Sequence, residues 1–201
     1  MENMELCIRS DFNDFYDSIC SDKGTLYNRY INKGMQRGTA IRYLQSIGVK
    51  TVEIQQVSQI SSMYANKVVV YTDTIKHESK GKRIMTLDEA QSLYPSYLAS
   101  VFHEDTNGIT LKYLQIGTKR YRLWFKKDIE SLEKGQLYHI EILDDYNSRA
   151  INVPIYSIDY IMTKNGALAT DLNEVQNLEK LGMQNYISAE QVVKEIINFY
   201  K

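Results

Sequence analysis

Two carboxylates and one amide lie in stretches of the sequence that otherwise resemble buried strand. Asp159 is part of IYSIDYI, while Asp171 and Asn173 are part of GALATDLNEV. Aspartate and asparagine are depleted in strands, so these positions raise the question of a chemical role. Carboxylate and amide oxygens are the ligands that Mg²⁺ prefers in proteins, and a magnesium site is one such role.

The segment 164–166 (Lys-Asn-Gly) is a strong turn signal and predicts a hairpin between the two stretches. Loop length decides which side chains share a face. A two-residue Asn-Gly loop would place Asp159 and Asp171 on opposite faces. A three-residue loop would place them opposite each other, with Asn173 on the same face, and a divalent cation would remove the repulsion. The spacing leaves open the alternative that Asp159 is a solvated strand residue and Asp171 begins a turn into a helix.

Two basic stretches could bind an anion. Lys80, Gly81 and Lys82 lie in the polar loop KHESKGK, which could equally be a solvated hairpin tip. Arg120 and Arg122 alternate with apolar side chains in KRYRLWFKK, so a strand would present both on one side. The planar guanidinium group suits phosphate or carboxylate oxygens, although a basic strand can also simply face water.

Composition narrows the class of protein. The chain has 201 residues and a formal net charge of −1, which does not indicate a broad nucleic-acid surface. No apolar run reaches membrane-spanning length, and the first residues do not form a signal peptide. The two cysteines, Cys7 and Cys20, are expected to be reduced thiols, and no Cys/His cluster has zinc spacing. We therefore expect a protein of the cytoplasm that does not associate with membranes.

Hydrophobic periodicity predicts the α+β class with mostly antiparallel sheet. Residues 37–48 have helical spacing and end in Gly48. Further helices are expected to begin at Thr86, which can form a capping box with Glu89, and at Ser188. Pro95 predicts either a break or the start of a second helix. Strands are predicted at 49–56, 67–72, 109–116, 119–126, 136–143, 153–163 and 167–172.

The hairpin resembles the C-terminal magnesium motif of ATP-grasp enzymes, in which an acidic residue on one strand precedes an acid-x-Asn pair on the next. Asp159, Asp171 and Asn173 match these three positions. Three upstream segments resemble further parts of that fold in the same order. They are RGTAIRYLQSIGVKTVEIQQV, NKVVVYTDTIKHESKGKRIMTLDEA and LKYLQIGTKRYRLWF. The resemblance covers roughly residues 35–201, and Tyr71 occupies a position where the family usually has a phosphate-binding lysine.

The resemblance implies an ATP-grasp-like fold of two mostly antiparallel sheets with flanking helices that enclose a nucleotide cleft. It divides the chain into a short N-terminal segment (1–34), a smaller lobe with a covering loop (35–108) and a larger lobe with the metal hairpin (109–201). It also implies an ATP- and Mg²⁺-dependent ligase that activates a carboxylate as an acyl phosphate for attack by an amine.

In that function each candidate residue has a role implied by the family. The Mg²⁺ ligands would be Asp159, Asp171 and Asn173. The nucleotide would be covered by Lys80, Gly81 and Lys82. The catalytic residue would be Arg122, which stabilises the negative charge that develops on the transferred phosphoryl group. The expected partner is a small-molecule or peptide substrate. The sequence does not indicate an oligomeric state.

Two other functions are left open. The first is a catalytically degenerate protein with this fold that binds a nucleotide or a partner, because Tyr71 replaces the usual lysine and the N-terminal segment is short. The second is a basic aromatic nucleic-acid-binding module that uses Arg120, Arg122 and Trp124. The net charge makes nucleic acid the less favoured partner. The sequence also resembles proteins of large tailed phages, which would place it in the host cytoplasm.

Overall fold

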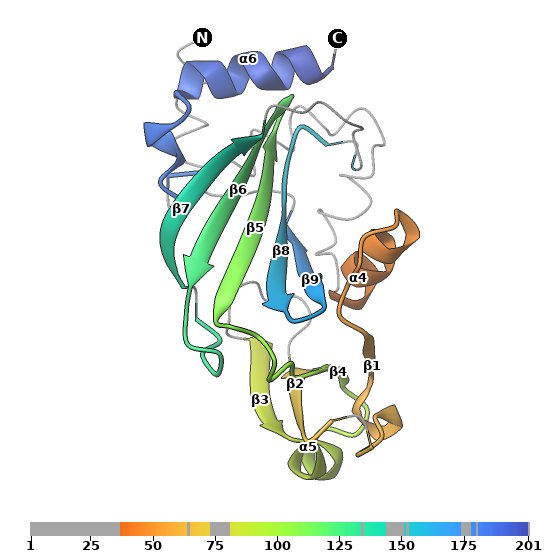
Figure 1. The fold of residues 1–201 in the computed structure, drawn as a ribbon. Coiled ribbons are helices and arrows are strands. Elements are labelled where there is room, and N and C mark those ends of the chain that lie inside the picture. The colour runs from red at the N-terminus through yellow and green to blue at the C-terminus, as the bar shows by residue number, and fades with distance from the viewer. Residues whose placement is uncertain are drawn as a thin grey trace.

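The computed structural model of the chain describes residues 37–63, 65–72, 81–133, 135–143, 151, 153–173, 178–179 and 181–200. Within these residues the chain forms two antiparallel sheets, of four and five strands, and three α-helices (Figure 1). The expected α+β class with antiparallel sheets is confirmed. The N-terminal segment 1–34, Lys80 and most of the predicted covering loop lie outside the described residues.

The smaller sheet has the strand order β1-β4-β2-β3. Its bounds are β1 (Ile54–Gln56), β2 (Lys67–Tyr71), β3 (Lys82–Thr86) and β4 (Leu98–Val101). Helix α5 (Leu87–Leu93) follows β3 directly, and Thr86 and Glu89 form the predicted capping box at its start. The helix ends before Pro95, and the chain then turns into β4. The break expected at Pro95 is confirmed, whereas β4 itself was not among the predicted strands.

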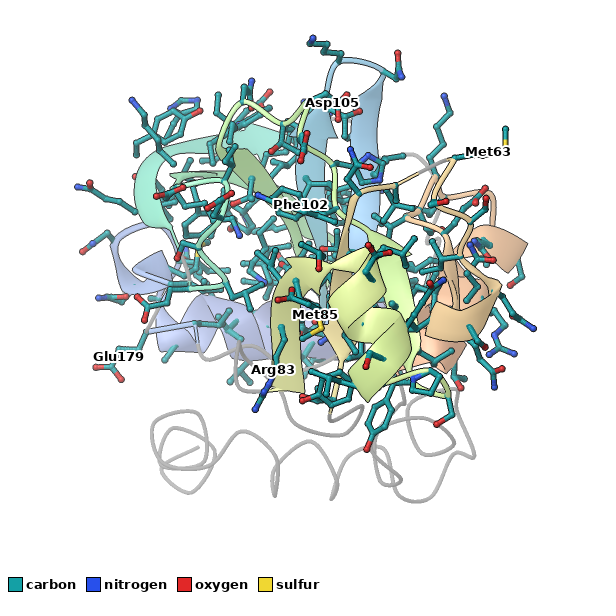
Figure 2. The ribbon with its side chains drawn as sticks, turned by 90° about the horizontal axis from the view of Figure 1, so that it is seen from below. Met63, Arg83, Met85, Phe102, Asp105 and Glu179 are labelled. Carbon is teal, nitrogen blue, oxygen red and sulfur yellow. The ribbon has the colours of Figure 1, made fainter. Side chains whose placement is uncertain are left out.

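The two faces of the smaller sheet have different environments. Val68 and Val70 pack beneath α5, in a buried cluster with Leu87 and Ala90. Figure 2 views the molecule from the side of α5 and labels Met85, which packs against this cluster. Because successive strand residues alternate between faces, the residues between the valines and next to them point the other way. This second face carries Tyr71, Lys82 and Ser100.

The larger sheet has the strand order β7-β6-β5-β8-β9. Its bounds are β5 (Ile109–Ile116), β6 (Lys119–Lys126), β7 (Gln136–Leu143), β8 (Ile155–Thr163) and β9 (Gly166–Asn173). Helix α4 (Arg37–Ser46) packs against β9. Helix α6 (Ala189–Phe199) lies across the strand ends remote from the smaller sheet (Figure 1). Both helices contribute to the main hydrophobic core, and Ser188 forms the predicted cap of α6 with Gln191.

The hairpin β8–β9 has the predicted pairing of Asp159 with Asp171, but its loop differs from the predicted one. Its loop has two residues, since Thr163 faces Gly166, so the expected three-residue loop is wrong. A β-bulge then shifts the register, because Tyr160 faces Ala169 whereas Asp159 faces Asp171. The extra residue is Thr170, and the bulge restores the side-by-side acids that the longer loop was expected to produce.

None of the helices in the described part of the chain is long and apolar enough to cross a bilayer, the longest being α6 with 11 residues.

We predict that the turn between β5 and β6 tolerates no side chain at Gly117. A Cβ there would lie 2.3 Å from the carbonyl oxygen of Glu195 in α6, and φ is +58°. Gly48 has φ of +82° with open space around it, so Gly48→Ala adds backbone strain alone, about 1–2 kcal/mol. Gly117→Ala should cost about 1–3 kcal/mol more in the free energy of unfolding by urea. Equal costs for the two variants would contradict the close approach.

Candidate functional site

The carboxylates of the hairpin lie where the two sheets approach each other. Asp159 and Asp171 face each other, and the amide nitrogen of Asn173 donates to Asp159 Oδ2 at 3.1 Å. The expected gathering of these three side chains on one face is therefore confirmed, while their role as metal ligands stays a prediction. We call the polar cluster around them the sheet junction, which comprises Arg37, Tyr71, Lys82, Lys112, Lys127, Asp159, Asp171 and Asn173.

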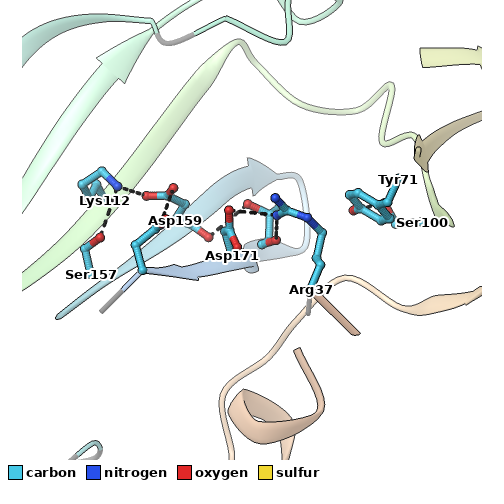
Figure 3. A network of polar contacts seen from close by, with 9 residues as sticks. Arg37, Tyr71, Ser100, Lys112, Ser157, Asp159 and Asp171 are labelled. Atoms are coloured by element: carbon cyan, nitrogen blue, oxygen red, sulfur yellow. Dashed lines mark hydrogen bonds and ion pairs between the residues drawn. The ribbon is translucent and has the colours of Figure 1, made fainter. Parts of the chain in front are cut away.

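Lys112 is the first counter-ion of the sheet junction (Figure 3). It lies on β5 directly opposite Asp159 of β8, so both side chains share one face of the larger sheet. Its ammonium group forms an ion pair with Asp159 Oδ1 and donates to the hydroxyl of Ser157 at 3.2 Å. Lys112 is only 9% exposed, and burying a lysine costs free energy unless an anion accompanies it. Asp159 supplies that anion.

Arg37, the first residue of α4, is the second counter-ion. Its Nη1 lies 2.9 Å from Asp171 Oδ2 and also donates to the backbone carbonyl of Thr170 at 3.2 Å. The guanidinium carbon lies 5.0 Å from the centre of the Tyr71 ring, in cation–π range. Arg37 therefore contacts the bulge, the second acid and the smaller sheet (Figure 3). It is 5% exposed, and its Nε has no hydrogen-bond partner among the described residues.

Lys82 brings a third positive charge from the smaller sheet. It faces Tyr71 across β2 and β3, on the side away from α5. Burial, and after it the positive charge of Arg37, lower the pKa of Lys82 from its ordinary value of 10.5 to about 8. The charges of Asp171 and Asp159 oppose this shift. Lys82 is therefore close enough to the hairpin to sense both acids.

Lys127, just after β6, is the fourth cation. Burial lowers its pKa and the charge of Asp159 raises it. Among the described residues, two cationic side chains thus pair with the two carboxylates, and two more, Lys82 and Lys127, lie close enough for their charges to interact with them. Such a surplus of partly buried positive charge favours the binding of an anion that carries several negative charges.

Arg122 does not join this cluster. It faces Tyr113 on β5, one residue along from Lys112, so it points to the other face of the larger sheet. There it is 44% exposed and pairs with Glu141 on β7, with Nη1 3.3 Å from Oε2. The structure thus corrects the expected position of Arg122 beside the acids. Its catalytic role stays a prediction, and the function proposed below does not depend on it.

The other predicted nucleotide-binding residues fall at the start of β3. Gly81 is buried directly before the strand, and Lys82 begins it, while Lys80 lies outside the described residues. Lys82 therefore belongs to the rigid sheet and not to the tip of a covering loop. The binding role of all three residues stays a prediction.

Sequence reasoning missed Arg37, Lys112 and Lys127. Lys112 had a recognisable signal, because a lysine in the apolar run ITLKYLQI needs an anionic partner if the strand is buried. Arg37 had none, since its partner lies far along the chain and on a different element. Lys127 follows a strand in a basic run, where solvent exposure is the usual outcome.

The oxygen atoms of Asp159, Asp171 and Asn173 are chemically suited to a hard cation such as Mg²⁺. The part of the chain that the structure describes contains no group of three or more His, Cys, Asp or Glu side chains that could hold a metal ion. Both carboxylates are also engaged by cations of the chain itself. These three residues therefore suit a metal ion that is also coordinated by oxygens of a bound ligand. They suit less well a metal ion that is coordinated by protein side chains alone.

Comparison with known proteins bears on the fold of the chain. No protein-family model matches the sequence, and no curated protein matches it. Solved structures do resemble the chain. N5-carboxyaminoimidazole synthetase from Staphylococcus aureus, complexed with ADP, has a TM-score of 0.60 at 11% identity, covering 91% of this chain and 57% of its own.

Two further solved structures, a macrocyclase and an ATP-grasp ligase, also resemble the chain. The macrocyclase MdnB from Microcystis aeruginosa has a TM-score of 0.58 at 15% identity, and the match covers 100% of this chain and 71% of MdnB. The ATP-grasp ligase PsnB, complexed with a variant of its minimal precursor, Mg and ADP, has a TM-score of 0.56 at 10% identity. That match covers 85% of this chain and 60% of PsnB.

The chain has the ATP-grasp fold, with its two antiparallel sheets and its flanking helices arranged as in these ligases. Since identities of 10–15% establish a shared fold only, activity and substrate require separate arguments. The chain spans less than two thirds of the length of the synthetase and of PsnB.

We predict that Arg37 stabilises the protein mainly by neutralising Asp171. Arg37→Met would leave this carboxylate, 16% exposed, without its cation, at a cost of about 3–5 kcal/mol in the free energy of unfolding. Arg37→Met combined with Asp171→Asn should recover part of that loss. Arg122→Met, which breaks an exposed pair, serves as the control and should cost less than about 1 kcal/mol. The absence of recovery in the double variant, measured by urea unfolding, would contradict the prediction.

A second prediction follows from the low pKa of Lys82. The unfolded chain keeps its Lys82 proton up to about pH 10.5, whereas the folded protein releases it near pH 8. Between these values the unfolded state binds more protons, so the stability contribution of Lys82 rises with pH. The gain in stability from Lys82→Met should therefore be larger at pH 7.5 than at pH 9.5.

Urea unfolding of both proteins at the two pH values is the measurement. The charges of four other groups also act on Lys82, namely Arg37, Asp159, Asp171 and Lys127. They are present in the wild type and in Lys82→Met, so their own titration largely cancels when the two unfolding free energies are subtracted. If the difference in unfolding free energy between Lys82→Met and the wild type is the same at both pH values, the Lys82 amine is not buried among these charges.

Proposed function

We propose that the protein is an ATP- and Mg²⁺-dependent ligase that activates a carboxylate for attack by an amine. The observation that carries the proposal is the surplus of positive charge around two carboxylates at the sheet junction, in a chain with the ATP-grasp fold. Cations that outnumber the acids are suited to phosphate groups, and the acids are suited to the metal that accompanies a nucleotide.

In this function the residues of the chain bind and orient. Lys82 and Lys127 would bind phosphate oxygens, and Asp159, Asp171 and Asn173 would hold the metal. Mg-ATP, when bound, would supply the γ-phosphoryl group for activation of the substrate carboxylate and leave as ADP, and attack by the amine would release inorganic phosphate. The positive side chains stabilise the charge that spreads over the transferred group. Lys80 and Gly81 would cover the nucleotide.

The substrate proposed is a small molecule or a peptide. MdnB is a macrocyclase, and PsnB was solved with a variant of its minimal precursor. The similarity in fold to MdnB and PsnB supports a peptide as the substrate class. The similarity in fold to N5-carboxyaminoimidazole synthetase supports a small molecule. A cytoplasmic location would suit either class and stays a prediction, as does the low expectation of nucleic-acid binding.

A second candidate is a nucleotide-binding protein without turnover. The observation in its favour is Tyr71, which stands where the family usually has a lysine. Its hydroxyl is 2.9 Å from that of Ser100, and its ring packs against Arg37, so it offers no charge to a phosphate. Lys82 faces Tyr71 directly and could supply the missing charge, and for that reason we favour the enzyme.

We predict that the protein binds a non-hydrolysable ATP analogue in the presence of Mg²⁺, as measured by calorimetry. Asp171→Asn changes the shape of the side chain little but leaves Arg37 without its anion, and in the folded variant Mg²⁺-dependent binding should weaken by about tenfold or more. Glu141→Gln removes a carboxylate on the opposite face of the larger sheet and is the matched control. Equal affinity of the Asp171 variant and the wild type would reject the metal site.

The same proteins separate the two candidates. Binding of the analogue combined with release of ADP from ATP in the presence of candidate substrates supports the ligase. Binding without turnover supports the degenerate protein, and preferential binding of an oligonucleotide over ATP would favour the nucleic-acid module.

A further inference from the structure

The carboxylate oxygens of the hairpin are occupied by groups of the protein itself. Asp159 Oδ1 pairs with Lys112, and Asp159 Oδ2 accepts from the amide of Asn173 at 3.1 Å. Asp171 Oδ2 pairs with Arg37 at 2.9 Å. Three of the four carboxylate oxygens thus have a donor before any ligand arrives. A divalent cation on its own would have to displace these donors and would meet two buried positive charges nearby.

We propose that Lys112 and Arg37 act as exchangeable counter-ions. In the ligand-free protein they neutralise Asp159 and Asp171, and a bound polyphosphate takes over their positive charges and releases the carboxylates to a divalent cation. This inference rests on the proposed function, because it needs a nucleotide at the sheet junction. It adds a positioning role for two residues that the magnesium motif does not contain.

The geometry of Lys112 supports the exchange. Its ammonium group is held by Asp159 and by Ser157, on the same face of the sheet as both acids. A lysine side chain can swing its ammonium group by several ångströms without a backbone change, and it loses no hydrogen bond if a phosphate oxygen replaces the carboxylate. Lys112 can therefore follow the charge of the ligand while its stem stays packed.

Arg37 shows an unfilled hydrogen-bonding capacity in the same place. Its Nε is buried without a partner among the described residues, although nearly all buried donors in folded proteins are satisfied. The two further cations nearby, Lys82 and Lys127, have lowered values of pKa because they are buried, which an anion would reverse. Both features indicate that the sheet junction is completed by an anion.

The test measures metal binding without nucleotide, using the electron paramagnetic resonance signal of free Mn²⁺. Wild-type protein should bind Mn²⁺ weakly, because the internal cations compete with it. Lys112→Gln should bind Mn²⁺ about 5- to 150-fold more tightly, since it keeps a donor for Ser157 and Asp159 but removes the charge. Lys112→Met is the second variant, and Lys126→Met, an exposed lysine on the same sheet, is the control.

The outcomes are distinct. Unchanged Mn²⁺ affinity in folded Lys112→Gln or Lys112→Met would overturn the counter-ion role. Tighter Mn²⁺ binding in these variants, lost again when Asp159→Asn is added, would support it. Calorimetry with the ATP analogue and a chelator tests the proposed function separately. If that experiment shows no nucleotide binding while the Lys112 variants bind Mn²⁺ more tightly, the proposed function fails and the pairing of Lys112 with the metal ligands stands.

Discussion

One extra residue in β9 determines the chemistry of the sheet junction. Without the bulge at Thr170, Asp159 would face Thr170, and Asp171 would point to the opposite side of the larger sheet. The bulge is held from both directions, because the Thr170 hydroxyl donates to the carbonyl of Asp159 and its own carbonyl accepts from Arg37. The same arginine neutralises Asp171. The local distortion of the strand and the charge that it exposes are therefore stabilised by a single side chain from α4.

The charge distribution follows from where each sheet places its basic residues. The larger sheet contributes Lys112 opposite Asp159, and the smaller sheet contributes Lys82 on the face that α5 leaves uncovered. These basic side chains come together where the two sheets approach each other, and partial burial there strengthens electrostatic interactions. A polyphosphate would thus be recognised jointly by basic side chains of two sheets, each of which packs on its own hydrophobic cluster.

Much of the fold could be predicted because period-2 runs and capping boxes are local signals. The boundaries of β5, β6 and β7 and the caps at Thr86 and Ser188 agree with expectation. The face of Arg122 could not be predicted, since it depends on the register between strands. The pairing of Asp159 with Asp171 was expected from a three-residue loop. The loop has two residues, and the bulge at Thr170 makes up for the missing one. Arg37 was out of reach, as its contacts join residues more than a hundred positions apart.

The position of Arg37 also has a mechanical consequence. Its guanidinium group contacts Tyr71 of the smaller sheet on one side and Asp171 of the larger sheet on the other. A rotation that moves Tyr71 away from Asp171 would stretch one of these two contacts or both. The angle between the two sheets and the electrostatic state of Asp171 are therefore linked through one planar group. A movement of the sheets would change the environment of the Asp171 carboxylate, and a change of partner at this carboxylate would alter how easily the sheets move.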